Sequence, residues 1–232
     1  MATRQIVALS GGGFLMEPGN PRLDNHLLEL LGSTRRRVCF IPTASGDSAD
    51  FIVRFYQAYP ASRCQPSHLP LFVRGKEELR ARLLEQDAVF VGPGNTLNML
   101  ALWRLHGLDA VLREAWEQGV MLCGMSAGAM CWFEGGLTDS LGSLAPFRNG
   151  LGLLPGTLCP HYDSEPERRP AYQRFISEGL SGGLAADDGV GFHFIGTQLT
   201  HTFSSREKAQ AWRVERTEAG VREQSLPVTL LQ

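Results

Sequence analysis

The chain has 232 residues, 43% of them hydrophobic, and a formal net charge of -2. This length and composition allow a substantial core and fit a single domain spanning residues 1–232. The weakly acidic balance argues against a nucleic-acid-binding surface, and the chain contains no run of about 18 apolar residues, so we expect no membrane span.

The first part of the chain alternates short apolar segments with helical patterns. We predict strands at 5–10, 37–41, 68–72, 87–91 and 120–123. Helices are predicted at 50–59, 77–86, 96–106 and 108–118, with a short helix at 127–133. Strands that alternate with helices of about ten residues are typical of parallel crossover units. We therefore predict an α/β fold whose doubly wound, mostly parallel sheet is flanked by helices.

The later part of the chain is predicted to contain antiparallel strands. Short strands are expected within 151–160, and a helix is expected at 169–180. A strand at 184–186, a turn at Asp188-Gly189 and a strand at 191–195 indicate a strand–turn–strand hairpin. Segments 197–203 and 211–214 continue as an antiparallel edge. Nothing in the sequence resembles a linker or a repeat, which supports one α/β domain.

A Gly-x-Ser-x-Gly pattern, Gly124 to Gly128, follows the strand at 120–123. In a nucleophile elbow of this kind, a sharp strand-to-helix turn exposes the serine hydroxyl, and a Cβ at either glycine would collide with a neighbouring element. Ser126 is therefore the candidate nucleophile. Alternatively, Ser126 only caps the helix. Cys123 and Cys131 do not occupy the apex of the turn and are weaker candidates.

Two further glycine-rich loops follow predicted strands, where parallel sheets build their sites. Gly11-Gly12-Gly13 lacks the third glycine of GxGxxG, and we expect no matching helix there, so a nucleotide is not predicted. The loop at 92–96 opens a helix, so its N–H groups can face the same cleft as Ser126. We assign the two donors of an oxyanion hole to the N–H groups of Gly94 and Ala127. The alternative for this loop is a turn plus a helix cap.

A serine nucleophile needs a general base, normally histidine. Among the six histidines, His161 follows a short strand and precedes a polar run, which places it on a loop at a strand end. The acid that orients the imidazole is less defined. A rigid strand end favours Asp188 or Asp187, and Asp139 follows the elbow helix. Asp163 is expected to project to the other side of the chain.

Three ordered motifs resemble the peptidase E family of serine peptidases, which includes aspartyl dipeptidase and has cyanophycinase as a relative. They lie at 92–96 (Gly-Gly-Gly-Asn-Thr in the family), at 124–129 and at 159–162 (Pro-His-Phe in the family). The resemblance implies a fold like that of class I glutamine amidotransferases and a Ser-His-Glu triad. Ser126 and His161 then act as nucleophile and base. The family's glutamate falls on Asp188, which is one methylene shorter, and Asp139 is the runner-up.

The resemblance also implies a substrate. In aspartyl dipeptidase an arginine downstream of the histidine binds the acidic N-terminal residue of the peptide. Arg169 lies roughly at that place, and we assign Arg169 and Asn95 to substrate binding, with a surface ion pair as the alternative for Arg169. The predicted function is hydrolysis of short peptides, with N-terminal Asp preferred, through an acyl-enzyme and without a metal or cofactor. The resemblance implies a homodimer.

The same residues leave alternative functions open, and the cysteines indicate a cellular compartment. A cyanophycinase-like or other amide hydrolase and a non-catalytic small-ligand binding protein would both retain this fold. An α/β-hydrolase esterase fits less well, because only 35 residues separate Ser126 from His161. Five cysteines, an odd number without the CxxC spacing of zinc sites, favour a reducing cytoplasm.

Overall fold

The computed structural model describes residues 3–32, 36–72 and 78–232. Its first sheet has eight strands, in the spatial order β14 (Thr229–Leu230), β11 (Gln198–Ser204), β10 (Val190–Ile195), β1 (Gln5–Leu9), β5 (Met121–Met125), β4 (Ala88–Val91), β2 (Arg37–Ile41) and β3 (Gln65–His68). The strands from β1 to β3 in this order run parallel. β10 is antiparallel to β1, and β11 is antiparallel to β10. The sheet is thus mostly parallel, with antiparallel strands from the later chain, as predicted.

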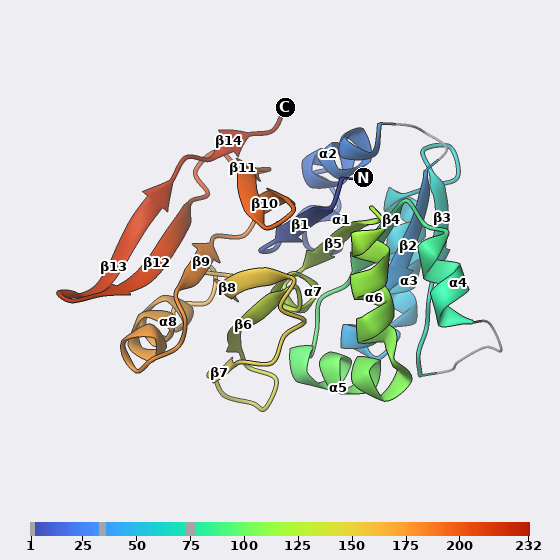
Figure 1. The fold of residues 1–232 in the computed structure, drawn as a ribbon. Helices are drawn as coiled ribbons and strands as arrows, with labels where there is room; N and C mark the ends of the chain where they lie inside the picture. Colours follow the sequence, from blue (N-terminus) through green and yellow to red (C-terminus); the bar gives the residue numbers. More distant parts are fainter. Residues whose placement is uncertain (1–2, 33–35, 73–77) are drawn as a thin grey trace.

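Helices cover both faces of the first sheet (Figure 1). They are α1 (Gly13–Met16), α2 (Arg22–Leu31), α3 (Ala49–Ala58), α4 (Leu79–Leu84), α5 (Thr96–His106), α6 (Leu108–Glu117) and α7 (Ala127–Met130), with a 3-10 turn at Thr43–Ser45. A further helix, α8 (Arg168–Ser177), lies on the second sheet. Phe14, Leu23 and Phe55 of α1 to α3 pack with Val7 and Phe40 on one face. Side chains of α4, α5 and α6 pack on the opposite face. Among the described residues, no helix is long and apolar enough to cross a membrane.

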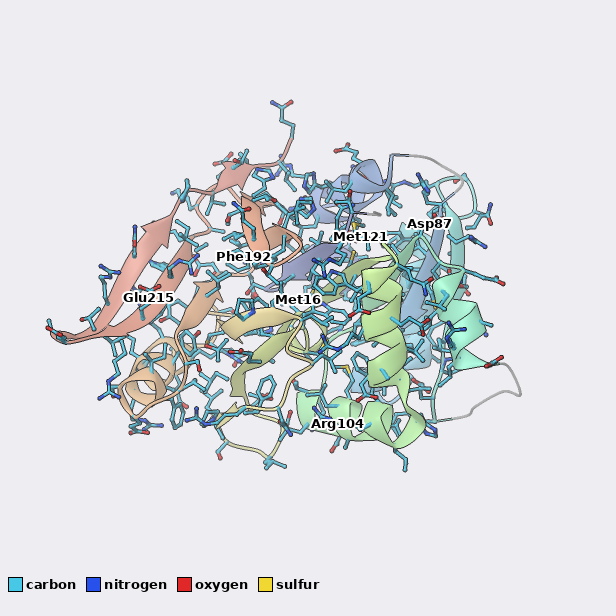
Figure 2. The ribbon with its side chains drawn as sticks, viewed as in Figure 1. Met16, Asp87, Arg104, Met121, Phe192 and Glu215 are labelled. Carbon is cyan, nitrogen blue, oxygen red and sulfur yellow. The ribbon has the colours of Figure 1, made fainter. Side chains whose placement is uncertain are left out.

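A second sheet of six strands was not predicted. Its order is β13 (Gly220–Leu226), β12 (Ala211–Thr217), β9 (Gly183–Ala186), β8 (Leu154–Cys159), β6 (Phe133–Thr138) and β7 (Ala145–Phe147). One face packs against the first sheet, where Phe133, Leu158 and Leu184 share an apolar cluster with Phe192 of β10, labelled in Figure 2. α8 covers the other face through Tyr172 and other buried side chains. β12 and β13 form a long hairpin that extends from the body (Figure 1).

Two predictions about the later strands and the elbow helix are wrong. The expected hairpin of 184–186 and 191–195 does not form, because β9 pairs with β8 and β12 in the second sheet, whereas β10 pairs with β1 and β11 in the first. The turn between them therefore carries the chain from one sheet to the other. The helix predicted at 127–133 ends at Met130, since the chain enters β6 at Phe133.

Three predictions in the first part also differ from the structure. The strand expected at 68–72 lies at Gln65–His68, because the N–H groups of Leu71 and Phe72 bind the Oδ2 atom of Asp47 instead of a strand. A four-residue helix, α1, opens at Gly13, where none was expected. Of the helix predicted at 77–86, residue 77 lies outside the described residues and α4 spans Leu79–Leu84.

Candidate active site

Ser126 lies at the turn between β5 and α7, with φ 53° and ψ -113°. Such a left-handed conformation is costly for a non-glycine residue and persists only where its surroundings enforce it. A Cβ on Gly124 would meet the carbonyl of Gly128, and a Cβ on Gly128 would meet the carbonyl of Val91, both closer than 3.0 Å. The two glycines therefore allow the tight turn that the sequence pattern predicted.

Three side chains from distant segments form one hydrogen-bonded chain. The Nε2 atom of His161 lies 2.8 Å from the Oγ atom of Ser126. The Nδ1 atom of His161 lies 2.6 Å from Oδ1 of Asp188. His161 and Asp188 are buried, whereas Ser126 is partly exposed. This arrangement has the geometry expected of a nucleophile, a base and an orienting acid.

The electrostatics of the acid favour its role as an acceptor. Burial raises the pKa of the Asp188 carboxyl, but the hydrogen bond and charge of His161 lower it, and the resulting pKa lies below its ordinary value. An ionised carboxylate only accepts hydrogen bonds, so Nδ1 of His161 carries the proton. The Nε2 atom is then free to accept the hydroxyl proton of Ser126. Asp163, expected to point away, instead accepts the backbone N–H of Asp188 at 2.9 Å.

Of the three acids considered from the sequence, Asp188 is the one that contacts the imidazole in the described structure. Asp187 points elsewhere, and its Oδ2 accepts the backbone N–H of Gln210 at 2.9 Å. Burial raises the pKa of Asp187 to about 6. Asp139 is exposed on the turn after β6, and none of its described contacts reaches His161. The two carboxylates lie between β9 and β10, and their different hydrogen-bond partners separate Asp188 from Asp187.

The proposed oxyanion donors leave neighbouring strand ends. Val91 of β4 pairs with Gly124 of β5, so the loop with Gly94 begins beside the elbow. Gly94 has φ +137°, and a Cβ there would meet the Ala44 carbonyl. No hydrogen bond among the described residues uses the N–H of Gly94 or of Ala127. Both donors are therefore available to a bound oxyanion.

Comparison with known proteins identifies the family. The model of peptidase family S51 matches residues 6–202. The chain belongs to peptidase family S51. It is 51% identical over 229 residues to the "Uncharacterized peptidase YgaJ" of Bacillus subtilis strain 168, covering 98% of this chain and 99% of that protein. It is 34% identical over 137 residues to "Peptidase E" of Streptomyces coelicolor, covering 56% of this chain and 53% of that protein.

A solved structure supports the same fold. The crystal structure of a peptidase from an acI-B1 actinobacterium superposes with a TM-score of 0.69 at 18% identity, covering 97% of this chain and 95% of that one. The resemblance to the peptidase E family noted from the sequence is confirmed. Membership of S51 makes the protein a serine-type peptidase that acts on peptides. The roles of individual residues stay predictions.

The substrate-binding residues predicted for this S51 peptidase already have partners within the protein. Arg169 is exposed on α8, and its guanidinium lies over the rings of Tyr162 and Trp212, 5.5 and 5.0 Å from their centroids. Its Nε and Nη2 atoms donate to Oε2 of Glu223. Asn95 caps α5, since its Oδ1 accepts the N–H of Asn98 at 2.9 Å and its Nδ2 donates to the backbone of the turn after β6.

The cysteines considered as alternative nucleophiles are buried. Cys123 lies within β5, and Cys131 follows α7. Burial raises the pKa of both thiols above the ordinary value, which disfavours the reactive thiolate. Sequence reasoning missed Ser10, whose hydroxyl binds the backbone of His161, and placed Asp163 on the wrong side of the chain, although its carboxylate binds the backbone of Asp188. The signal for Ser10 was its position at the carboxyl end of a buried strand, one residue before a glycine-rich loop.

Proposed function

We propose that this S51 peptidase hydrolyses short peptides with Ser126 as nucleophile, His161 as general base and Asp188 as the orienting acid. The observation that carries the proposal is the continuous chain of hydrogen bonds from Oγ of Ser126 through the imidazole to the Asp188 carboxylate. The strained backbone of Ser126, which lifts the hydroxyl out of the sheet, supports the same role.

The reaction proceeds in two stages. The Oγ atom of Ser126 attacks the scissile carbonyl carbon while Nε2 of His161 takes the hydroxyl proton. The N–H groups of Gly94 and Ala127 stabilise the tetrahedral oxyanion. The C–N bond then breaks as the imidazolium of His161 protonates the leaving amine. Water, deprotonated by the same imidazole, attacks the acyl ester, and the ester bond breaks to release the acid and restore the Ser126 hydroxyl.

The finer part of the proposal concerns the peptide. The family resemblance implies N-terminal Asp as the preferred residue, recognised by Arg169. Because Nε and Nη2 of Arg169 already bind Glu223, a bidentate grip through this edge of the guanidinium requires exchange of Glu223 for the substrate. Asp-X dipeptides are therefore the first substrates to test, beside peptides that begin with Ala, Glu or Arg.

The experiment combines a chemical probe with a peptide panel. Wild type and Ser126→Ala are incubated with a fluorophosphonate and, separately, with dipeptides and tripeptides. Ser177→Ala is the matched control, since Ser177 is exposed at the end of α8. We expect labelling and cleavage in the wild type and the control but not in Ser126→Ala. Full activity of a pure Ser126→Ala preparation would refute the assignment.

Three broader expectations accompany this proposal. One domain spanning residues 1–232 is supported by the apolar cluster that both sheets share. A reducing cytoplasm is supported by the five buried cysteines, which are all free thiols. A homodimer is supported by the resemblance alone, and light scattering of the purified protein tests it directly.

A further inference from the structure

The end of β1 and the glycine-rich loop after it have no role in the mechanism above, yet they contact the backbone of His161 and the carboxylate of Asp188. Ser10, which precedes this loop, is fully buried. Its hydroxyl donates to the carbonyl of Ala186 at 2.8 Å and accepts the backbone N–H of His161 at 2.9 Å. A single hydroxyl thus joins the segment that carries the proposed base to the strand that ends just before the proposed acid.

The backbone of His161 needs such support. Its φ is 58°, one of three positive values among the described non-glycine residues. A non-glycine residue in this region is strained and relaxes unless its contacts hold it. The hydrogen bond to Ser10 fixes the His161 N–H in this conformation. The next residue, Tyr162, is held by its own N–H bond to the Ala186 carbonyl at 3.0 Å.

Gly11 holds the acid from the other side. The Asp188 carboxylate lies directly against its Cα, so that a Cβ on Gly11 would come within 2.8 Å of Cγ of Asp188 and closer still to Oδ1. The Gly11 carbonyl also accepts the N–H of Gly189 at 3.0 Å. Two consecutive residues at the end of β1 therefore contact the site: Ser10 binds the backbone of His161, and Gly11 contacts the carboxylate of Asp188.

We propose that Ser10 is a positioning residue, whose hydroxyl sets the orientation of His161 between Ser126 and Asp188. This inference rests on the proposed function, because it concerns the same three side chains. Without the hydroxyl, the buried N–H of His161 loses its acceptor, and the peptide leaves its left-handed conformation. The imidazole then moves away from both hydrogen bonds of 2.8 and 2.6 Å.

The test compares Ser10→Ala with a variant that loses an equally buried hydroxyl elsewhere. Thr157 on β8 is buried, and its hydroxyl bonds with the Tyr172 hydroxyl at 2.7 Å and the Ser181 carbonyl at 2.8 Å. Thr157→Val therefore matches the loss of two buried hydrogen bonds away from the site. Thermal unfolding, kcat and KM on a cleaved peptide, the kcat–pH profile and the fluorophosphonate labelling rate are measured for each protein.

We expect Ser10→Ala to lower kcat by about 100-fold with KM nearly unchanged, as for a misplacement of about 1 Å. Its kcat–pH profile changes relative to that of the wild type, whereas the profile of Thr157→Val does not. Thr157→Val loses thermal stability but retains kcat. Ser10→Thr, which keeps the hydroxyl, recovers labelling and turnover relative to Ser10→Ala.

Two results would overturn the inference. One is a Ser10→Ala protein that folds, turns over at the wild-type rate and keeps the wild-type pH profile. The other is an equal loss of kcat in Ser10→Ala and Thr157→Val, which would make the hydroxyl of Ser10 merely structural. Failure of the proposed function is distinct from both, because the wild-type protein itself would then show no labelling or turnover dependent on Ser126.

Discussion

Replacing Gly11 with alanine is expected to lower kcat strongly while leaving the thermal stability of the protein nearly unchanged. The new Cβ would lie 2.8 Å from Cγ of Asp188 and 3.1 Å from the sulfur of Met16. Oδ1 of Asp188 would lie closer still, and ordinary contacts of a Cβ begin at 3.4 Å, so the carboxylate has to retreat by roughly 1 Å. The bond between Nδ1 of His161 and Oδ1 of Asp188, now 2.6 Å, then exceeds the range of a good hydrogen bond.

The two effects of Gly11→Ala differ in size. A displacement of this extent at a catalytic group lowers kcat by about 100-fold. Folding changes much less, because φ of Gly11 lies outside the left-handed region and alanine reduces the entropy of the unfolded chain by about 0.4 to 1 kcal/mol. The Asp188 side chain can rotate to relieve the clash. We therefore expect a nearly unchanged melting temperature together with a large loss of turnover.

Steady-state kinetics and thermal unfolding of the two proteins test this expectation. Gly19→Ala is the matched control, since a Cβ at Gly19 meets nothing within 4 Å and its φ is not positive. The control should keep both kcat and the melting temperature. A Gly11→Ala protein with kcat within about twofold of wild type would refute the reasoning, since the Asp188 carboxylate would then not need its present position.

Two further predictions concern buried carboxylates. Asp188→Asn should lower kcat in a peptide assay by about 10⁴-fold, because Asp188 binds the imidazole. The Asp187 side chain binds Gln210 instead, so Asp187→Asn should keep kcat within about tenfold of wild type. A larger loss of kcat in Asp187→Asn than in Asp188→Asn would exchange the roles of the two residues. Burial raises the pKa of Asp24 to about 6, so protonated Asp24 adds stability at low pH that is lost as the pH rises through about 6. From pH 4 to pH 8 the free energy of unfolding in urea should fall by an amount of the order of 2 to 3 kcal/mol for this reason, and Asp24→Asn should remove this part of the fall. The same dependence of the free energy of unfolding on pH in both proteins would contradict the prediction.

The elements of the first sheet could be predicted because their signals are local. Apolar runs such as 38–41 and 88–91 are buried on both faces, and the helices between them have the apolar spacing that packs onto a sheet. The elbow was equally local, since five consecutive residues define its turn. The second sheet was not predictable in this way. β9 and β10 have the pattern of a hairpin, and only their partners elsewhere in the chain separate them.

The same limit applies within the candidate site. Ser126 and His161 lie in motifs with distinctive neighbours, so their candidacy could be read from the chain. Asp187 and Asp188 are adjacent and chemically identical, and which one faces the imidazole depends on the register of β9. The contact of Ser10 with the His161 backbone joins residues 151 positions apart, and no local pattern encodes it.

The second sheet, absent from the prediction, sets the distance between the proposed base and the proposed acid. β8 and β9 are parallel neighbours, with Cys159 beside Ala185. Both strands end at the same edge, so His161 and Asp188 emerge side by side from adjacent strands. The proposed nucleophile, Ser126, follows β5 of the first sheet, and its N–H binds the carbonyl of Leu9, the last residue of β1. The next residue, Ser10, binds the N–H of His161. The end of β1 therefore links the two sheets and fixes the proposed nucleophile relative to the proposed base.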